Sequence, residues 1–474
     1  MTYTRLTLVL LVLLVSRVPL TAAAEAAKRI PYAEVESKER VVLRRYLDAA
    51  DWPIRVFGLL RLERYDGPEI EPILRRAAGD EAWPVRCFAI RAAMRQGVQL
   101  TAADLPAEET EPRVIRAALR AGIELDEERV ERVGLRLLRS RTLDTRLLGL
   151  EIAAASKSPK LRAQGARRIV TFIDNIEPMV LRIAGPRIAR MYHLDPAPLN
   201  LAQWRAWAAN SGGRIRDLPL PTKVVTSSPP SIVAEMDVET FNRLLDYLDV
   251  LRQRTMDIAL VMDSTASMRP MIDEARVGVD SLILFFNDIA RSMRLAFIAY
   301  RDHDNEPVWE GEVFTADVEH IRRFLFEIRI TGGTDLPEAV YDGLAACTRL
   351  DWNEDAHRQL ILIGDARPHD TDMGRTLDLA GRFFNEGIPV HAIHIEMVVP
   401  RNAPYATPEY LAQISEHNRL TVEAFQGIAE SGGGQFVALD DAHELVPTLM
   451  HTSIEEGWWT VFDEFYTLYR ELCR

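Results

Sequence analysis

Three short segments of the sequence carry oxygen-bearing side chains at spacings that suit a hard metal ion. Asp263, Thr265 and Ser267 alternate along one segment, so their side chains can converge on one point in an extended turn. Thr334 lies in a Gly-rich segment, and Asp365 follows an apolar run. Carboxylate and hydroxyl oxygens are ligands for Mg²⁺, and the set contains none of the Cys or His ligands typical of zinc. The pattern therefore predicts a divalent-cation site, for Mg²⁺ in the first place and with Ca²⁺ or Mn²⁺ as alternatives.

The elements around these segments predict how they are positioned. From residue 256 onward, short apolar runs typical of buried strands alternate with helical patterns. We expect strands at 258–262, 295–300, 308–314, 360–363, 390–395 and 436–439. We expect helices at 268–292, 317–329, 336–348, 373–386 and 419–430. This alternation predicts an α/β fold, a doubly wound and mostly parallel sheet whose two faces are covered. Ligands of such sheets bind beyond the carboxyl ends of the strands, where the three segments lie.

The same residues resemble the metal-ion-dependent adhesion site of the von Willebrand factor type A domain. The family pattern is Asp-x-Ser-x-Ser, then a Thr in a Gly-rich turn, then an Asp after a central strand. Here the pattern reads Asp263-x-Thr265-x-Ser267, Thr334 and Asp365, with Thr265 in place of the usual Ser but keeping its hydroxyl. The resemblance covers about residues 255–450 and implies a Rossmann-like domain over 255–474.

The resemblance also implies what the site does. Thr265, Ser267 and Thr334 would approach the metal, while Asp263 and Asp365 would bind it directly or through water. An open coordination position would be completed by an acidic group of a protein partner. The alternative is a domain of this fold whose site is empty or purely structural.

Residues 33–213 have the pattern of a helical repeat domain. The segment Trp52–Leu59 is matched by Trp83–Ile90, 31 residues later, and weaker copies follow near Glu111 and Leu143. In each strong copy a Pro stands in the first helical turn, where its missing N–H costs nothing, and an Arg faces the turn. This resembles HEAT-like repeats, which stack as an α-solenoid, and it predicts a span without β-structure. An irregular helical bundle is the alternative.

The flanking segments have other roles. Residues 1–24 read as a signal peptide, because an apolar run from Leu6 to Val15 is followed by small residues, and cleavage is expected between Ala24 and Glu25. The alternative is an uncleaved anchor. No later stretch is apolar enough to cross a membrane, so we expect a secreted or periplasmic protein. Residues 214–254 form a Pro-rich linker and a connecting helix that Asp237 can cap.

The charge excludes some functions. The formal net charge is −13, and residues 211–474 hold most of the excess of acidic groups. Binding to nucleic acid or to an anionic membrane is therefore not expected. The sequence has no general base beside a nucleophile, which argues against an enzyme.

We therefore expect a protein-binding module of the adhesion type. An accessory, non-catalytic subunit of an ATPase or another enzyme complex is the alternative.

Three further features remain open at this stage. The segment Arg301–Asp304 follows a strand and either tunes partner choice or is a solvated loop. The aromatic segment 458–469 is expected to pack in a core. Cys473 is the cysteine that could cross-link two chains, whereas Cys87 and Cys347 lie in apolar helical patterns and are expected in the core.

Overall fold

The computed structural model describes residues 29–140, 143–175, 178–192, 200–210, 230–331, 337–397, 406–441 and 444–473, together with residues 194, 197 and 399. The signal-like residues 1–24, residues 214–229 of the linker and Thr334 lie outside the described residues. Among the described residues, no helix has the length and apolar character needed to cross a bilayer.

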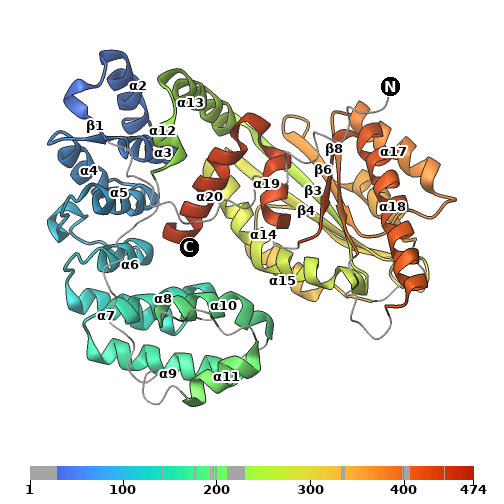
Figure 1. The fold of residues 1–474 in the computed structure, drawn as a ribbon, viewed down its shortest axis with the longest axis horizontal. Helices are drawn as coiled ribbons and strands as arrows, with labels where there is room; N and C mark the ends of the chain where they lie inside the picture. The colour runs from blue at the N-terminus through green and yellow to red at the C-terminus, as the bar shows by residue number, and fades with distance from the viewer. Residues whose placement is uncertain are drawn as a thin grey trace.

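The first part of the chain is helical, as its periodicity predicts, and its helices form an arc on one side of the molecule (Figure 1). The helices α2 and α3, α4 and α5, and α7 and α8 pack against each other, and α3 also packs against α5 of the next copy. The helices of this region are α2 (Ser37–Leu47), α3 (Trp52–Leu62), α4 (Ile70–Ala78), α5 (Trp83–Gln96), α6 (Pro112–Arg120), α7 (Glu127–Leu138), α8 (Leu143–Ala155), α9 (Pro159–Asn175), α10 (Pro178–Met191) and α11 (Leu201–Asn210).

The two strong copies of the repeat make equivalent contacts. The Nη1 atoms of Arg55 and Arg86 each donate to the carbonyl oxygens five and six residues earlier, at 2.7 to 3.0 Å. Each guanidinium also forms an ion pair with an acid of the following segment, Arg55 with Asp80 at 2.7 Å and Arg86 with Glu109 at 2.6 Å. These arginines satisfy the carbonyl groups of the turns and tie each repeat to the next.

The expectation that residues 33–210 contain no β-structure is wrong at one place. β1 (Ile30–Pro31) pairs in parallel with β2 (Tyr65–Asp66), and the Ile30 N–H donates to the Arg64 carbonyl at 3.0 Å. The chain that enters the first repeat runs beside the turn after α3, where extended backbone groups need partners. The pairing is two residues long, and no other strand occurs in the described residues before 255.

Two helices connect this region to the C-terminal domain, α12 (Ile232–Glu235) and α13 (Val238–Gln253). The carboxylate of Asp237 accepts from the backbone N–H of Thr240 at 2.8 Å and so caps α13, as the sequence predicts. α13 packs against both α2 and the long helix α14 (Arg269–Ile289). The connecting helix therefore contacts both parts of the molecule.

The C-terminal domain contains a six-stranded sheet in the order β5-β4-β3-β6-β7-β8, parallel except for β5. The antiparallel direction of the edge strand is consistent with the expectation of a mostly parallel sheet, which is confirmed. Its cause is the connection of eight residues between β4 and β5, because a parallel crossover needs a dozen residues or more. The strands are β3 (Thr255–Asp263), β4 (Ser292–Tyr300), β5 (Trp309–Thr315), β6 (His357–Gly364), β7 (Val390–Ile395) and β8 (Gly433–Leu439).

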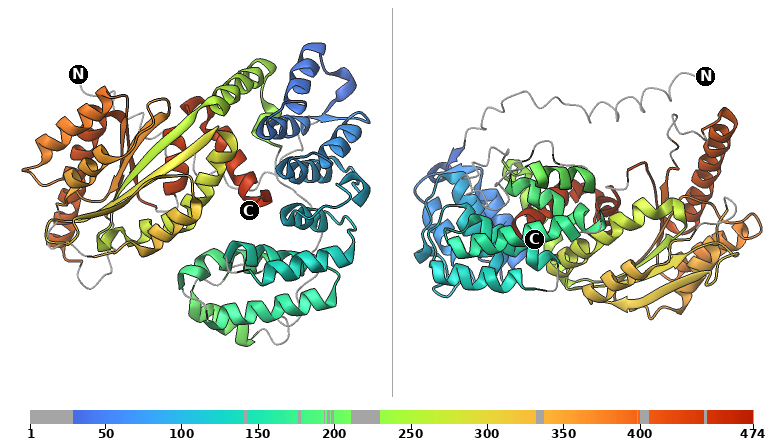
Figure 2. Two further views of the ribbon diagram at one scale, coloured as in Figure 1. Left: turned by 180° about the vertical axis from the view of Figure 1, so that it is seen from behind. Right: turned by 90° about the horizontal axis from the view of Figure 1, so that it is seen from below.

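Helices cover both faces of this sheet (Figures 1 and 2). Alternate residues of β3 show the division, since Ile258, Leu260 and Met262 belong to one hydrophobic core and Ala259 and Val261 to the other. The first core is shared with α14, α15 (Val318–Glu327), α19 (Leu445–Ser453) and α20 (Trp459–Cys473). The second is shared with α16 (Val340–Ala346), α17 (Met373–Asn385) and α18 (Pro408–Ser431).

The aromatic segment near the C-terminus lies in a core, as expected, and this core joins the two parts of the chain. The Phe465 ring of α20 lies 4.7 Å from the Phe57 ring and 5.9 Å from the Phe88 ring of the helical region. It also lies 5.4 Å from the Phe285 ring of α14, measured between ring centroids. Figure 1 shows α20 between the arc of helices and the sheet domain. The helical region and the sheet domain are therefore packed together through α20.

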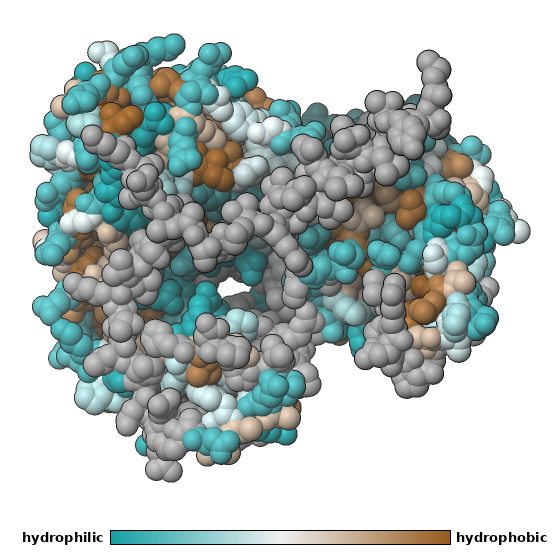
Figure 3. Space-filling view, viewed as in Figure 1, coloured by the Kyte–Doolittle hydropathy of each residue, from teal (hydrophilic) through white to brown (hydrophobic). Residues whose placement is uncertain are grey.

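Among the coloured residues of the face shown in Figure 3, hydrophilic residues predominate and the hydrophobic ones lie in small separate patches. The two cysteines expected in the core, Cys87 and Cys347, are both buried and free.

Candidate metal centre

The sheet register brings the two predicted carboxylates together. Asp263 is the last residue of β3, and Asp365 follows β6 directly. β3 and β6 are neighbours and parallel, with Met262 opposite Ile363. Because both strands end at the same edge, Asp263 and Asp365 lie side by side beyond the carboxyl end of the sheet. Both side chains are buried, with 0% and 3% of their surface exposed.

The turn after β3 converges as its alternating pattern predicts. The Oδ1 atom of Asp263 accepts hydrogen bonds from both the backbone N–H and the hydroxyl of Thr265, each at 2.7 Å. The Thr265 and Ser267 hydroxyl oxygens lie 3.2 Å apart. Thr265 is buried, whereas Ser267 is exposed. The oxygen set therefore runs from the buried carboxylates outward to solvent.

The predicted ligand Thr334 lies outside the described residues, but the chain leading to it passes the site. Thr331 pairs with Thr265 in a parallel β-bridge, and the Thr331 N–H donates to the Ser264 carbonyl at 3.3 Å. The structure thus brings together Asp263, Thr265, Ser267 and Asp365, and it places residue 331 beside them.

The electrostatics of this site favour a bound cation. Burial raises the pKa of Asp263, and the neighbouring charge of Asp365 raises it further. Burial also raises the pKa of Asp365. The Oδ2 atom of Asp263 has no hydrogen-bond partner among the described residues. Two buried adjacent carboxyl groups with an unsatisfied oxygen are costly without a positive charge, and a hard divalent cation fits this donor set.

Two supporting side chains were missed by the sequence analysis. His417 of α18 donates from Nε2 to the backbone carbonyl of Asp365 at 2.8 Å and so fixes the loop after β6. Tyr300, at the end of β4, is fully buried, and its hydroxyl has no hydrogen-bond partner among the described residues. Burial, and then the charge of Asp263, raise the pKa of Tyr300. The spacing of the motif does not predict the role of His417, because this residue belongs to α18, which is distant in the sequence.

The alternative that Arg301–Asp304 is a solvated loop is wrong for its first two residues. Arg301 and Asp302 are buried, with 1% and 4% of their surface exposed. The guanidinium of Arg301 donates to the carbonyl of Pro307 at 2.8 Å and to that of Arg329 at 3.0 Å. Arg301 therefore holds the loop after β4 against neighbouring segments of the same rim.

Gly364 permits the close approach of Tyr300 to the site. A Cβ atom at Gly364 would lie 2.5 Å from the Tyr300 hydroxyl and 3.3 Å from the Cβ of Asp263. We expect Gly364→Ala to destabilise the protein by about 1–3 kcal/mol through overpacking. Urea unfolding with a chelator present measures this change. Gly374→Ala is the control, because nothing lies within 4 Å of its added Cβ; equal effects of the two substitutions would contradict the packing argument.

Comparison with known proteins identifies the fold of the sheet domain. Residues 257–441 match the family model of the von Willebrand factor A domain. A segment of 132 residues is 28% identical to the alpha-protein kinase vwkA of Dictyostelium discoideum. It covers 27% of this chain and 21% of the kinase, so the chain spans about a fifth of the length of that relative.

Two solved structures are also similar to part of the chain. An aerotolerance-related membrane protein of Bacteroides fragilis is 18% identical with a TM-score of 0.30, covering 42% of this chain and 98% of its own. The pilus adhesin SpaC of Lactobacillus rhamnosus, in an open conformation, is 15% identical with a TM-score of 0.31, covering 43% of this chain and 30% of its own. The family-model match confirms over residues 257–441 the von Willebrand factor A domain expected from the sequence, and this domain supports a protein-interaction module.

Proposed function

Because residues 257–441 form a von Willebrand factor A domain, we propose that its rim binds Mg²⁺ and captures an acidic group of a protein partner through that ion. Asp263 and Asp365 would supply the negative charge, and Thr265, Ser267 and Thr334 the neutral oxygens. When bound, the cation supplies a positive point charge for a partner carboxylate. The protein acts by recognition and performs no catalysis of its own.

The observation that carries this proposal is the pair of buried carboxyl groups. Asp263 uses Oδ1 to hold the turn through Thr265, so its Oδ2 atom remains for a ligand beside Asp365. A structural salt bridge would place an Arg or Lys here, but among the described residues neither forms an ion pair with Asp263 or Asp365. The exposed hydroxyl of Ser267 lies at the outer side of the set, where a partner can reach the ion.

Affinity capture tests the proposal. The wild-type protein is immobilised and exposed to the exported protein fraction in Mg²⁺ and in chelator, beside Asp263→Ala and Asp370→Ala. Asp370 is an exposed acid on the loop that also carries Asp365, so it controls for surface charge. We expect wild type and Asp370→Ala to retain the same partner proteins in Mg²⁺ and to lose them in chelator. Retention that survives the chelator or the Asp263→Ala substitution would contradict the proposal.

We also propose that the protein acts outside the cytoplasm, on the basis of the N-terminal sequence. The run from Leu6 to Val15 followed by Ala22–Ala24 has the arrangement of a cleaved signal peptide. Mass spectrometry of the mature protein should then give Glu25 as its first residue. An intact N-terminus on protein isolated from the cytoplasm would refute export.

A further inference from the structure

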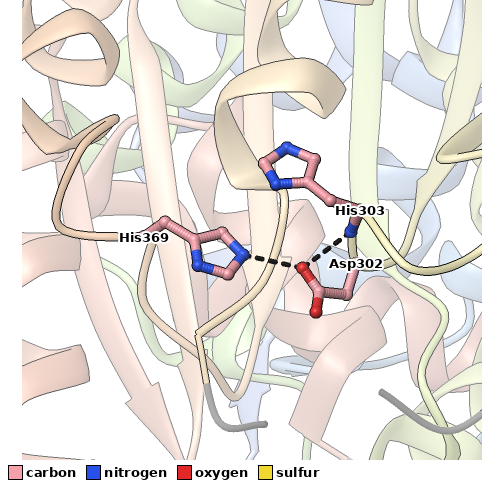
Figure 4. A group of neighbouring side chains, drawn as sticks. All are labelled: Asp302, His303 and His369. Atoms are coloured by element: carbon pink, nitrogen blue, oxygen red, sulfur yellow. Dashed lines mark hydrogen bonds and ion pairs between the residues drawn. The ribbon is translucent and has the colours of Figure 1, made fainter. Parts of the chain in front are cut away.

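A group of potential metal ligands lies on the same rim, at Asp302, His303 and His369 (Figure 4). One ligand atom from each of these residues lies within 4.8 Å of the others. Asp302 and His303 belong to the loop after β4, whereas His369 belongs to the loop after β6, four residues beyond Asp365. Two loops of different strands therefore meet at this group.

Two hydrogen bonds meet at one carboxylate oxygen of Asp302, one from the His369 side chain and one from the His303 backbone. The Oδ1 atom of Asp302 accepts from His369 Nε2 at 2.7 Å and from the backbone N–H of His303 at 2.7 Å. The two imidazole rings are stacked, with centroids 4.9 Å apart and an interplanar angle of 15°. Asp302 is buried, His369 is half-buried and His303 is exposed, so the group is open to solvent on one side.

A second carboxylate orients His303. The Nε2 atom of His303 is hydrogen-bonded to Asp342 Oδ2 at 2.9 Å, which leaves its Nδ1 atom as the free ring nitrogen. A histidine that ligates a metal typically donates its other ring N–H to a carboxylate, which fixes its tautomer and its orientation. Asp342 therefore occupies the position of the carboxylate that would orient a metal-bound His303.

We propose that Asp302, His303 and His369 bind a borderline divalent cation, of which Zn²⁺ is the best match. Two imidazole nitrogens and one carboxylate oxygen suit Zn²⁺ and leave a fourth position for water. This donor set differs from the oxygen set at Asp263, which suits Mg²⁺. The Asp302 and Asp342 carboxylates supply the negative charge that attracts the ion.

The ion must draw its ligands together slightly. Zn–N bonds of about 2.0–2.1 Å place neighbouring tetrahedral ligand atoms about 3.3 Å apart, whereas the present separations extend up to 4.8 Å. Exposed His303 and half-buried His369 can close this gap by side-chain rotation. When the ion binds, the neutral His369 ring carries its proton on Nδ1, and the hydrogen bond between His369 Nε2 and Asp302 Oδ1 is replaced by bonds from the two residues to the ion. The bound ion would then cross-link the loop after β4 to the loop that carries Asp365.

Titration of the full chain, prepared without a histidine tag, tests this site. Co²⁺ serves as the spectroscopic probe and Zn²⁺ as the competitor, both in excess Mg²⁺. We expect the wild type to bind one equivalent, with visible Co²⁺ bands of a site that contains nitrogen ligands. His303→Ala and His369→Ala should each lose at least about tenfold in affinity, and Asp342→Asn about 10- to 100-fold.

Two control variants make the result decisive. His320 forms a similar His–carboxylate pair with Glu312 at 2.9 Å but is not part of the group, so His320→Ala should bind as the wild type does. Asp263→Ala should keep Zn²⁺ binding even where it loses Mg²⁺, which separates this site from the proposed function. Thermal unfolding of each variant in chelator confirms that it is folded. Absence of Zn²⁺ binding in the wild type, or equal Zn²⁺ binding by the wild type and the two histidine variants, would overturn the proposal.

Discussion

Replacing Asp263 by alanine should remove all stabilisation of the protein by Mg²⁺. A ligand that binds only the folded state at 100 times its Kd stabilises that state by about 2.7 kcal/mol. The wild type should gain this amount on addition of Mg²⁺, whereas Asp263→Ala should gain nothing. The reason is that Asp263 is one of two charged groups in the proposed ligand set, and its Oδ2 atom has no other partner among the described residues.

Urea unfolding with and without Mg²⁺ measures this difference. Asp370→Ala, on the exposed part of the loop that carries Asp365, should keep the full gain. A gain in Asp263→Ala that matches the wild type would show that Mg²⁺ binds elsewhere on the protein.

Replacing Glu151 by alanine should destabilise the protein by about 3–5 kcal/mol, the usual effect of removing one partner of a buried ion pair. Glu151 of α8 is buried, and its carboxylate pairs with Arg116 at 2.7 Å and with Arg187 at 2.9 Å. Arg116 also donates to the carbonyl of Leu472 in α20 at 2.8 Å. Removal of Glu151 therefore leaves a buried guanidinium uncompensated at the junction between the helical region and α20.

The same group gives a pH dependence with a definite sign. Burial alone would raise the pKa of Glu151, but the charges of Arg116, Arg187 and Arg120 outweigh it and lower the pKa to about 2. A carboxyl group with a lowered pKa stabilises the folded state fully at pH values above its ordinary pKa, which is 4.5 here. This contribution is lost as the pH falls toward 2.

Denaturant unfolding of the wild type and of Glu151→Gln is compared between pH 5 and pH 2, the range that contains both the ordinary and the lowered pKa of Glu151. The difference in unfolding free energy should shrink by roughly 3 kcal/mol as the pH falls. A difference that is independent of pH would show that Glu151 is not held ionised by its arginines.

The sequence was sufficient to predict the sheet domain because its signals are local. Continuous apolar runs such as Ile258–Met262 are typical of strands buried on both faces, and the two carboxylates of the adhesion-site pattern, Asp263 and Asp365, each come just after such a run. The resemblance to the adhesion-site pattern placed Asp263 and Asp365 in one site, and the parallel pairing of β3 and β6 brings them together. The repeat in the helical region was also visible, since Arg55 and Arg86 make the same contacts 31 residues apart.

The rest depended on contacts between distant segments. His417 supports the metal centre from α18, and no spacing rule connects it with Asp365. The meeting of Asp302 with His369 requires the order of the strands, which apolar patterning does not specify. The contacts of Phe465 involve three helices from both halves of the chain. The aromatic pattern around Phe465 indicates only that this segment is buried, and it does not indicate which helices it contacts.

The central claim is that a divalent cation binds at the carboxyl end of β3 and β6. Calorimetric titration of Mg²⁺ into the wild type and into Asp263→Ala tests it most directly, with both proteins shown to be folded by thermal unfolding in chelator. We predict a saturable heat of binding for the wild type and no heat beyond dilution for Asp263→Ala. Equal Mg²⁺ affinity in the two proteins would contradict the placement of the site at Asp263.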